Sequence, residues 1–348
     1  MSDAPLYRTP AHRRRKVAAA LEALTASRRV ILTTHLNADG DGTGSQVALG
    51  TWLRALGAQV RIVNPTPFPE MYSFLLEKVG EPSMMAEAGG AEARAACARA
   101  DLAVVLDTGE VQRIGRVKPM IEHLKTLVID HHPPGDQPIG GISFRDPDAC
   151  ATGELVYDVM LASGGPWPEA ALEGLYTAIL TDTGSFRFSN STPGAHRVVA
   201  DLIAGGVEPE RMHKLVYGSA PLRRFELLRE ALETLEVDED GRVAWMTIPG
   251  GGEDDPKASA DDLEGIVDYP RMVRGVEVGL LFRAAMGGTK ISFRSNGPVD
   301  VNALARRFGG GGHVKASGAL VDRGLEEVIP EVVHAAREAV QDTLGALR

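Results

Sequence analysis

The chain has 348 residues, of which 44% are hydrophobic and 24% are charged, a composition typical of a globular protein. Its length is sufficient for two domains of ordinary size, each with its own hydrophobic core. The net charge is −10, from 47 acidic and 37 basic residues, which argues against a protein that coats duplex nucleic acid through a broad basic face.

The amino-terminal segment and the two cysteines bear on where the protein works. Residues 12–21 combine basic residues with a short apolar run, but Glu22 interrupts that run, so we expect a first helix rather than a signal peptide. No stretch approaches the ~20 apolar residues that a membrane span requires. Cys97 and Cys150 form no Cys-x-x-Cys pair, and we expect buried thiols in a reducing compartment. We therefore expect a cytoplasmic protein with no membrane partner.

The first 130 residues alternate between strand and helix patterns. Short runs of apolar, β-branched residues are typical of strands buried on both faces of a parallel sheet, and they lie at 30–34, 59–63, 102–106 and 126–129. Helical patterns lie at 44–56, 70–79, 90–100, 116–124, 154–160 and 170–180. The alternation predicts a doubly wound α/β domain with a mainly parallel sheet.

The pattern changes in the second half of the chain. Pro193-Gly194 precedes a helical connector, and from residue 234 apolar residues alternate with period two, as in antiparallel strands. We expect a hairpin from 235–237 and 243–248, a solvated loop at 250–262, strands at 276–282, 290–294 and 318–321, and a helix at 301–308. The predicted organisation is a domain over 1–192, a connector over 193–233 and a smaller α+β domain over 234–348.

Metal-capable side chains occur in four groups of the first domain: His35 with Asp39 and Asp41 in a glycine-rich loop, Asp107, the triplet Asp130-His131-His132, and Asp182. The first three groups directly follow predicted strands. Because open α/β sheets bind ligands outside the carboxyl ends of their strands, these groups should meet at one place. Each aspartate taken singly also suits a helix cap or a turn, but their coincidence favours one metal site.

The type of ligand narrows the choice of metal. Carboxylates with a minority of imidazoles and no thiolate favour Mn²⁺ or Mg²⁺ over structural zinc, and we expect Mn²⁺, with Mg²⁺ or Co²⁺ as alternatives. Asp39, Asp41, Asp107 and Asp182 contribute four negative charges, which two divalent cations would neutralise. Two cations about 3.5–4 Å apart form the arrangement that hydrolyses phosphoesters.

The order of these groups resembles the DHH phosphoesterase superfamily, and Phe308-Gly309-Gly310-Gly311-Gly312-His313-x-x-Ala316-Ser317-Gly318 resembles the glycine-rich signature of its DHHA1 nucleic-acid-binding domain. In layout the chain is similar to the short bifunctional oligoribonucleases of that superfamily, which also act as phosphatases on 3′-phosphoadenosine 5′-phosphate. One departure is visible, because Asn37-Ala38 stands where the family often has a proline. The resemblance implies an active site in the cleft between the two domains.

The resemblance also implies a role for each site residue. It places His35, Asp39 and Asp107 on a first metal, and Asp41, Asp107, His131 and Asp182 on a second, with Asp107 bridging the two. His132 would contact the scissile phosphate and protonate the leaving oxygen, while Asp130 would orient the site. His132, Asp130 and Asp107 are therefore the expected catalytic group.

Substrate-binding residues are expected in the second domain. Backbone N–H groups of Gly310, Gly311 and Gly312 can approach a phosphate closely, and His313 can add a charged donor. Arg294, with Ser295 beside it, is the best candidate to hold a terminal phosphate, and a solvated surface arginine is the alternative. Further basic residues of a local patch are Arg283, Lys290, Arg306, Arg307 and Lys315. Phe186 and Phe188 would stack on a base or, more simply, pack in the core.

These residues together predict a metal-dependent phosphohydrolase that grips a very short single-stranded RNA or a small nucleotide. Alternatives are a phosphodiesterase for cyclic or linear dinucleotides, a single-strand-specific exonuclease, which normally needs a longer basic channel, and a pyrophosphatase, which would leave 309–313 unexplained. A non-catalytic nucleotide sensor is the remote alternative. We expect no duplex nucleic acid as partner, and the sequence leaves a homodimer open.

Overall fold

The computed structural model describes residues 5–80, 84–248, 265–285 and 287–346. The chain divides into two compact units, Met1–Ser219 (unit 1) and Ala220–Arg348 (unit 2). The division lies inside the expected connector, and the domain boundaries at 192 and 233 stay a prediction, as does an active site between the units. The loop expected at 250–262 lies outside the described residues.

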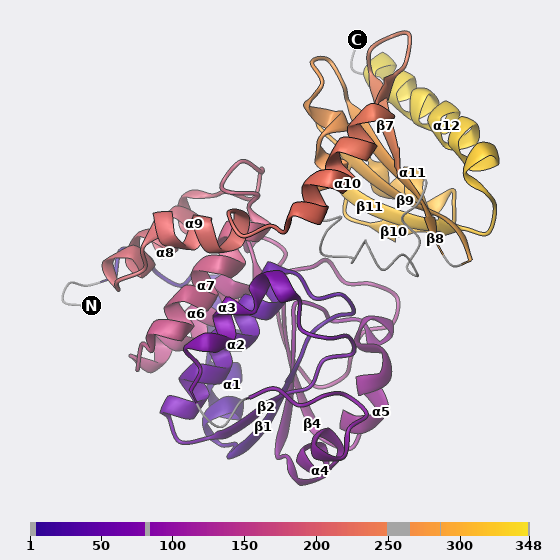
Figure 1. Ribbon diagram of the computed structural model, residues 1–348. Helices are drawn as coiled ribbons and strands as arrows, with labels where there is room; N and C mark the ends of the chain where they lie inside the picture. Colours follow the sequence, from indigo (N-terminus) through magenta and orange to yellow (C-terminus); the bar gives the residue numbers. More distant parts are fainter. Residues whose placement is uncertain (1–4, 81–83, 249–264, 286, 347–348) are drawn as a thin grey trace. The chain divides into compact units, whose positions relative to one another are not determined.

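A five-stranded parallel sheet forms the centre of unit 1 (Figure 1). The strand order is β2-β1-β3-β4-β5, formed by β1 (Arg29–Thr33), β2 (Gln59–Ile62), β3 (Leu102–Leu106), β4 (Lys125–Asp130) and β5 (Ile142–Arg145). The first four confirm the predicted strands. The sequence pattern does not predict β5, because only Phe144 of its four residues is buried.

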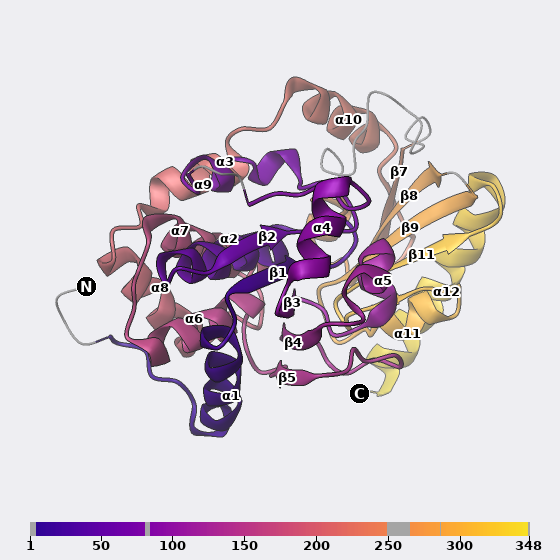
Figure 2. The same ribbon diagram turned by 90° about the horizontal axis from the view of Figure 1, so that it is seen from below.

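Alternate residues of these strands face two separate cores, which is why their sequences are apolar at consecutive positions. Leu32 and Val104 pack with α1, α2, α6 and α7 on one face, while Ile31 and Val105 pack with α4 and α5 on the other. Figure 2 shows these two groups of helices on opposite sides of the sheet. The helices on the first side are α1 (Arg14–Thr25), α2 (Gly40–Ala55), α6 (Thr152–Ser163) and α7 (Glu169–Asp182), and those on the second are α4 (Ala91–Arg99) and α5 (Lys118–Ile121).

Other expected helices are shorter or more divided than predicted. The helix expected at 70–79 is a 3₁₀ turn at Glu70–Tyr72 followed by α3 (Phe74–Glu77). The helix expected at 116–124 is the 3₁₀ segment η3 (Val111–Val117) followed by α5, with Gly115 in a non-helical conformation at φ 45°. The expected connector contains α8 (Pro193–Ala204), α9 (Pro209–Tyr217) and α10 (Leu222–Glu233).

Helix α2 begins four residues before its predicted start. Asp39 caps it, since its carboxylate accepts hydrogen bonds from the N–H groups of Asp41 and Gly42. The part of the expected glycine-rich loop that follows Asp39 is therefore the first turns of a helix. Its glycines allow close packing, because a Cβ at Gly44 would lie 2.4 Å from the carbonyl oxygen of Gly174 on α7. Helices α2 and α7 thus touch backbone to backbone.

Unit 2 contains a six-stranded mixed sheet in the order β10-β11-β9-β8-β7-β6. Its strands are β6 (Glu236–Val237), β7 (Val243–Ile248), β8 (Val278–Ala285), β9 (Gly288–Ser295), β10 (Gly311–Gly312) and β11 (Ala316–Val321). Helices α11 (Val301–Arg306) and α12 (Leu325–Ala346) pack on one face, and α10 on the other. The sequence pattern does not predict α12, because Pro330 lies inside it and proline usually ends a helix.

Two further expectations concern the cysteines and the membrane. Cys97 and Cys150 are both buried free thiols, as predicted. Within the described ranges, every helix is too short or too polar to cross a membrane.

Candidate metal centre

The predicted ligand groups of unit 1 meet at the carboxyl end of its sheet. Thr33 ends β1 two residues before His35, Leu106 ends β3 directly before Asp107, and Asp130 is the last residue of β4. The side chains form three overlapping groups whose ligand atoms lie within 4.8 Å of one another. The groups are His35, Asp39 and Asp107; Asp41, His131 and Asp182; and Asp107, His131 and His132.

Asp107 stands between two of these groups. Its Oδ2 lies 3.2 Å from Nε2 of His35, and its Oδ1 lies 3.6 Å from Nε2 of His131. The backbone of Asp107 is left-handed, with φ 61°, a conformation that costs energy in a residue other than glycine and is concentrated at functional sites. The two oxygens of one buried carboxylate therefore face two different imidazoles.

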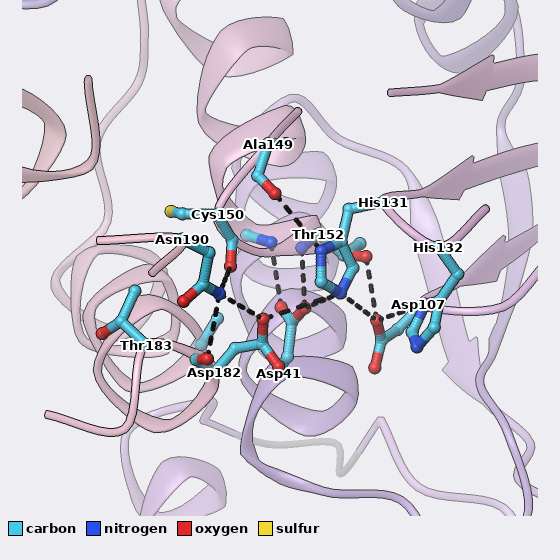
Figure 3. A network of polar contacts seen from close by, with 12 residues as sticks. Asp41, Asp107, His131, His132, Ala149, Cys150, Thr152, Asp182, Thr183 and Asn190 are labelled. Atoms are coloured by element: carbon cyan, nitrogen blue, oxygen red, sulfur yellow. Dashed lines mark hydrogen bonds and ion pairs between the residues drawn. The ribbon is translucent and has the colours of Figure 1, made fainter. Parts of the chain in front are cut away.

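The two ligand-type histidines are oriented in the same way. The carbonyl oxygen of Leu36 lies 2.8 Å from Nδ1 of His35, and the carbonyl oxygen of Ala149 lies 3.3 Å from Nδ1 of His131. A carbonyl only accepts, so Nδ1 carries the hydrogen and Nε2 faces the carboxylates. Nε2 of His131 lies 3.7 Å from Oδ2 of Asp41 and 3.7 Å from Oδ2 of Asp182 (Figure 3). A histidine that binds a metal is usually held in this manner by a partner at its other nitrogen.

Helix α6 holds two of the buried predicted ligands with its first residues. The backbone N–H groups of Thr152 and Gly153 donate to the carboxylate of Asp41 at 2.6 Å and 2.9 Å, as expected of the free donors at a helix amino terminus. The hydroxyl of Thr152 donates to Oδ1 of Asp107 at 3.0 Å. Sequence analysis missed the support from Thr152 and Gly153. The only sequence feature that indicates it is that this Thr-Gly pair directly precedes a predicted helix.

Asp182, the last residue of α7, is held by a residue that sequence analysis also missed. The side-chain amide of Asn190 donates to Oδ2 of Asp182 at 3.2 Å, and to the carbonyl oxygens of Asp182 and Cys150 at 3.0 Å and 2.8 Å (Figure 3). These bonds close the loop between Asp182 and Asn190 onto the ligand. The carboxylate of Asp182 is consequently fixed next to His131.

His132 joins the ligand groups to a further chain of contacts, since its Nδ1 lies 3.6 Å from Oδ1 of Asp107. Its Nδ1 lies 2.9 Å from Oδ1 of Asp130, which also accepts the backbone N–H of His132 at 3.0 Å. The other oxygen of Asp130 lies 3.2 Å from Nε of Arg145 on β5. A Cβ at Gly109 would lie 1.4 Å from that guanidinium, so the glycine makes room for it. Arg145 is another residue that the sequence pattern did not indicate, because β5 itself was not predicted.

The charges of the centre fit divalent cations. Burial, then the charges of Asp107 and Asp182, raise the pKa of Asp41 well above its ordinary value. Burial raises the pKa of Asp182 to about 7, with Asp107 and Asp39 adding to the effect and His131 opposing it. Burial disfavours the charged form of His35, but hydrogen bonds to Asp107 and Asp39 outweigh burial and raise the pKa of His35 to about 10. Protons thus compensate crowded carboxylates here, and bound divalent cations would replace them.

The donor types agree with that charge balance. The three groups together offer four carboxylates, three imidazoles and no thiolate, and these ligand types suit Mn²⁺ or Mg²⁺. The residues present therefore fit a pair of such ions.

The predicted substrate-binding residues lie in unit 2, at one corner of its sheet. Arg294 on β9 is opposite Ala316 on β11, and the carbonyl oxygen of Ala316 accepts the N–H of His313 at 2.7 Å. Nε of Arg294 lies 3.6 Å from Oδ1 of Asp268, and the hydroxyl of Ser295 is buried and donates to Gly297. These residues are near one another, but they belong to a unit other than that of the metal groups.

The glycine-rich segment of unit 2 differs from the expected loop. Gly311 and Gly312 form β10, which pairs with β11. The N–H of Gly309 donates to the carbonyl oxygen of Arg306, and that of Gly310 to the carbonyl oxygen of Ala305. The N–H of Gly312 donates to the side-chain oxygen of Asn302. Most of the backbone donors that we expected to meet a phosphate are therefore used within the unit, whereas the side chain of His313 is exposed.

The two phenylalanines after Asp182 separate into two roles. Phe186 packs against the core of unit 1, in agreement with the simpler of our two expectations. The ring of Phe188 remains 38% exposed, and the guanidinium of Arg187 lies 6.0 Å from its centre.

Comparison with known proteins identifies the class to which this fold and site belong. Residues 29–179 match the model of the DHH family, N-terminal domain, and residues 240–342 match the model of the DHHA1 domain. The chain therefore belongs to the DHH family of phosphoesterases.

Individual relatives resemble the chain over almost its whole length. The bifunctional oligoribonuclease and PAP phosphatase NrnA of Thermus thermophilus is 32% identical over 93% of this chain and 93% of its own. The NrnA protein of Bacillus subtilis is 28% identical over 84% of this chain and 89% of its own. A crystal structure of an exopolyphosphatase-related protein from Bacteroides fragilis has the same fold, with a TM-score of 0.82 at 24% identity over 94% of this chain and 96% of its own.

Proposed function

We propose that the protein hydrolyses the phosphoesters of very short RNA oligonucleotides and of 3′-phosphoadenosine 5′-phosphate with the aid of two divalent cations, Mn²⁺ being the first choice. The observation that carries this proposal is Asp107, whose two oxygens face the His35 group and the His131 group separately. One carboxylate shared by two ligand groups is what a two-metal hydrolase requires.

The proposed ligands follow the two groups. His35, Asp39 and Asp107 would hold one cation, and Asp41, Asp107, His131 and Asp182 the other. When bound, the pair would supply an activated water and would neutralise the oxygens of the phosphoryl group. The helix α6 donors to Asp41 and the Asn190 amide on Asp182 would keep the carboxylates in place for this task.

Proton transfer would be the role of His132. Asp130 holds its Nδ1 at 2.9 Å, so Nε2 is the nitrogen left to donate a proton to the leaving oxygen. Burial opposes the charge of His132, but the hydrogen bond to Asp130 outweighs it and raises its pKa. The ring therefore tends to keep the proton that this step needs.

Recognition of the nucleotide would fall to unit 2. His313 and Arg294 would contact a terminal phosphate through their side chains, with Ser295 and Gly310, Gly311 and Gly312 shaping the surface around them. Because the N–H groups of Gly310 and Gly312 already have acceptors, the glycines would act by allowing close approach rather than by donating.

The choice of substrate rests on the relatives. The proteins of Thermus thermophilus and Bacillus subtilis are both named as oligoribonuclease and PAP phosphatase, and each aligns with more than four fifths of this chain. We place the reaction in the cytoplasm, an inference supported by the two reduced, buried cysteines.

Hydrolysis of cyclic or linear dinucleotides is the second candidate function, since the same metal groups would serve that reaction.

One assay tests the proposal. Purified protein with Mn²⁺ is offered end-labelled di- to pentanucleotides, 3′-phosphoadenosine 5′-phosphate, a cyclic dinucleotide, pyrophosphate and a long single strand in parallel. We expect efficient turnover of the first two. Preferential hydrolysis of pyrophosphate or of the long strand would reject the proposal, and tight nucleotide binding without turnover would indicate a sensor.

Variants in the same assay test the assigned residues. Asp107→Asn should lower kcat by more than the roughly 10- to 100-fold effect of losing a supporting partner of a metal ligand. His313→Ala should raise KM for nucleotides and leave Mn²⁺ affinity unchanged. The exposed Asp148, changed to Asn, is the matched control in unit 1, and its kinetics should equal those of the wild type.

A further inference from the structure

One short segment of unit 1, residues 149–153, contacts most of the proposed ligands. Its backbone groups and the hydroxyl of Thr152 hold three of them directly, and the carbonyl oxygen of Cys150 shares the amide of Asn190 with a fourth (Figure 3). The three are His131, Asp41 and Asp107, and the fourth is Asp182. The position of segment 149–153 therefore governs the geometry of the proposed centre.

Glu154 and Asp146 hold this segment from its two ends. Oε2 of Glu154 accepts the backbone N–H of Cys150 at 2.8 Å, and the carbonyl oxygen of Asp146 accepts the N–H of Ala149 at 3.1 Å. Both acidic side chains are buried. Since a buried carboxylate requires a partner of its own, the group that matches these two charges also fixes the segment between them.

Arg13, in the amino-terminal segment, joins the two carboxylates. Its Nε contacts Oδ2 of Asp146, and its Nη1 donates to Oε1 of Glu154 at 2.6 Å. The side chain of Arg13 is only 3% exposed. The nitrogens of a guanidinium point in directions fixed by its planar fork, so one rigid group sets the separation of Asp146 and Glu154.

Stability alone explains this arrangement poorly. Nη1 of Arg13 also lies 3.1 Å from Oδ2 of Asp158 on α6, another fully buried carboxylate. Buried ion pairs seldom stabilise a fold more than apolar side chains of the same volume would. What the charged group provides is a defined geometry, and the segment that receives this geometry is the one that contacts the ligands.

We propose that Arg13 is a positioning residue of the metal centre. It holds Asp146 and Glu154 so that segment 149–153 keeps the group of Asp41, His131 and Asp182 in the arrangement that binds one divalent cation. This inference rests on the proposed function for the presence of two cations.

The two cations should depend on Arg13 to different degrees. In the described part of the chain, segment 149–153 meets the group of His35, Asp39 and Asp107 through the bond from Thr152 to Asp107. It contacts the other group through the bonds to Asp41, His131 and, by way of Asn190, Asp182. We therefore expect the loss of Arg13 to weaken mainly the cation of this other group.

The test compares Arg13→Met and Arg13→Lys with the wild type and with two controls. Arg14→Met removes the neighbouring arginine, which is exposed. Asp158→Asn removes a buried carboxylate that touches Arg13 but lies outside residues 146–154. Each protein is titrated with Mn²⁺ and followed by electron paramagnetic resonance, at a temperature at which circular dichroism shows it to be folded. The titration gives a Kd for each cation, and kcat and KM for a dinucleotide are then measured at saturating Mn²⁺.

We expect Arg13→Met to raise one of the two Kd values of Mn²⁺ by about 10-fold, the lower end of the range for residues that support a metal ligand. The other Kd, and KM at saturating Mn²⁺, should stay at the wild-type values. Arg13→Lys keeps the charge without the fork and should recover part of the loss. Both controls should bind Mn²⁺ as the wild type does.

Glu154→Gln provides a milder variant in case Arg13→Met does not fold. One of its two terminal atoms becomes an N–H donor, which faces either the N–H of Cys150 or the guanidinium of Arg13. The same Kd should rise by a smaller factor. Because Arg13 and Glu154 act through one link, the losses of Arg13→Lys and Glu154→Gln should combine to less than their product in the double variant.

Three results would overturn the inference: wild-type Kd values in folded Arg13→Met, an equal loss at both cations, or an equal loss in Asp158→Asn, since the last two would indicate general loosening of the fold. The metal titration needs no turnover. If the wild type hydrolyses no nucleotide while one Kd still depends on Arg13, the proposed function fails and the inference stands. If nucleotides are hydrolysed and neither Kd depends on Arg13, only the inference fails.

Discussion

At the scale of the residue, the centre depends on buried charges that are each matched by a partner. Asp107 is 1% exposed and touches His35, His131 and Thr152. Asp130 is equally buried, and it lies between His132 and Arg145. Burial of such groups costs free energy unless every partner is present, so the residues that support the ligands matter as much as the ligands.

Arg145 provides a test of this dependence. Arg145→Met should lower the free energy of unfolding of unit 1 by about 2–4 kcal/mol, because it leaves Oδ2 of Asp130 buried without the guanidinium beside it. Denaturation in urea measures the effect. In an Asp130→Asn background the same substitution should cost clearly less, and an equal cost in both backgrounds would show that Arg145 acts through something other than Asp130.

At the scale of the element, helices α2 and α7 set the distance between two proposed ligands. Asp41 lies in the first turn of α2 and Asp182 ends α7, and the helices touch at Gly44 and Gly174. A Cβ at either glycine would lie 2.4–2.6 Å from the carbonyl oxygen of the other. The close packing of these glycines therefore governs where both carboxylates stand.

Gly44→Ala is the corresponding prediction. Alanine is favoured over glycine in a helix by up to about 1 kcal/mol, yet here it should destabilise the protein by about 1–3 kcal/mol, because the backbones must separate. The melting temperature and the Kd of Mn²⁺ measure the two consequences. Gly345→Ala in α12 has open space around the new Cβ and should be neutral or stabilising. A stabilising Gly44→Ala would contradict this packing argument.

At the scale of the whole molecule, the two units have separate cores. Unit 1 packs its sheet between two layers of helices, and unit 2 packs its own sheet between α10 on one face and α11 and α12 on the other. Each unit thus has the internal packing of a domain. The proposed metal ligands all belong to the first.

Mn²⁺ should consequently stabilise only one unit. Calorimetry after treatment with a chelator should show two transitions, and Mn²⁺ at about 100 times its Kd should add roughly 2.7 kcal/mol to the stability of unit 1. The transition of unit 2 should stay in place. Asp182→Asn should reduce the shift, and a shift of both transitions would contradict the separation of the metal groups from unit 2.

The sequence by itself determined the local features of this protein. Consecutive apolar residues at 30–34 and 102–106 predicted strands buried on both faces, and the polar residues after them predicted a common site at one sheet edge. The spacing of His35, Asp39 and Asp41 likewise indicated metal-capable side chains, which the structure divides between two groups. These features depend on neighbours within a few residues, so periodicity and spacing reveal them.

Only the tertiary structure decided what holds the proposed ligands in place. The bonds from Thr152 and Gly153 to Asp41 join residues 111 and 112 positions apart in the sequence, and Arg145 reaches Asp130 from a strand with no apolar pattern. The glycines after Asp39 looked like a loop, and their contact with α7 shows that they belong to a helix. Such contacts arise when distant segments pack together, and no local pattern records which segments those are.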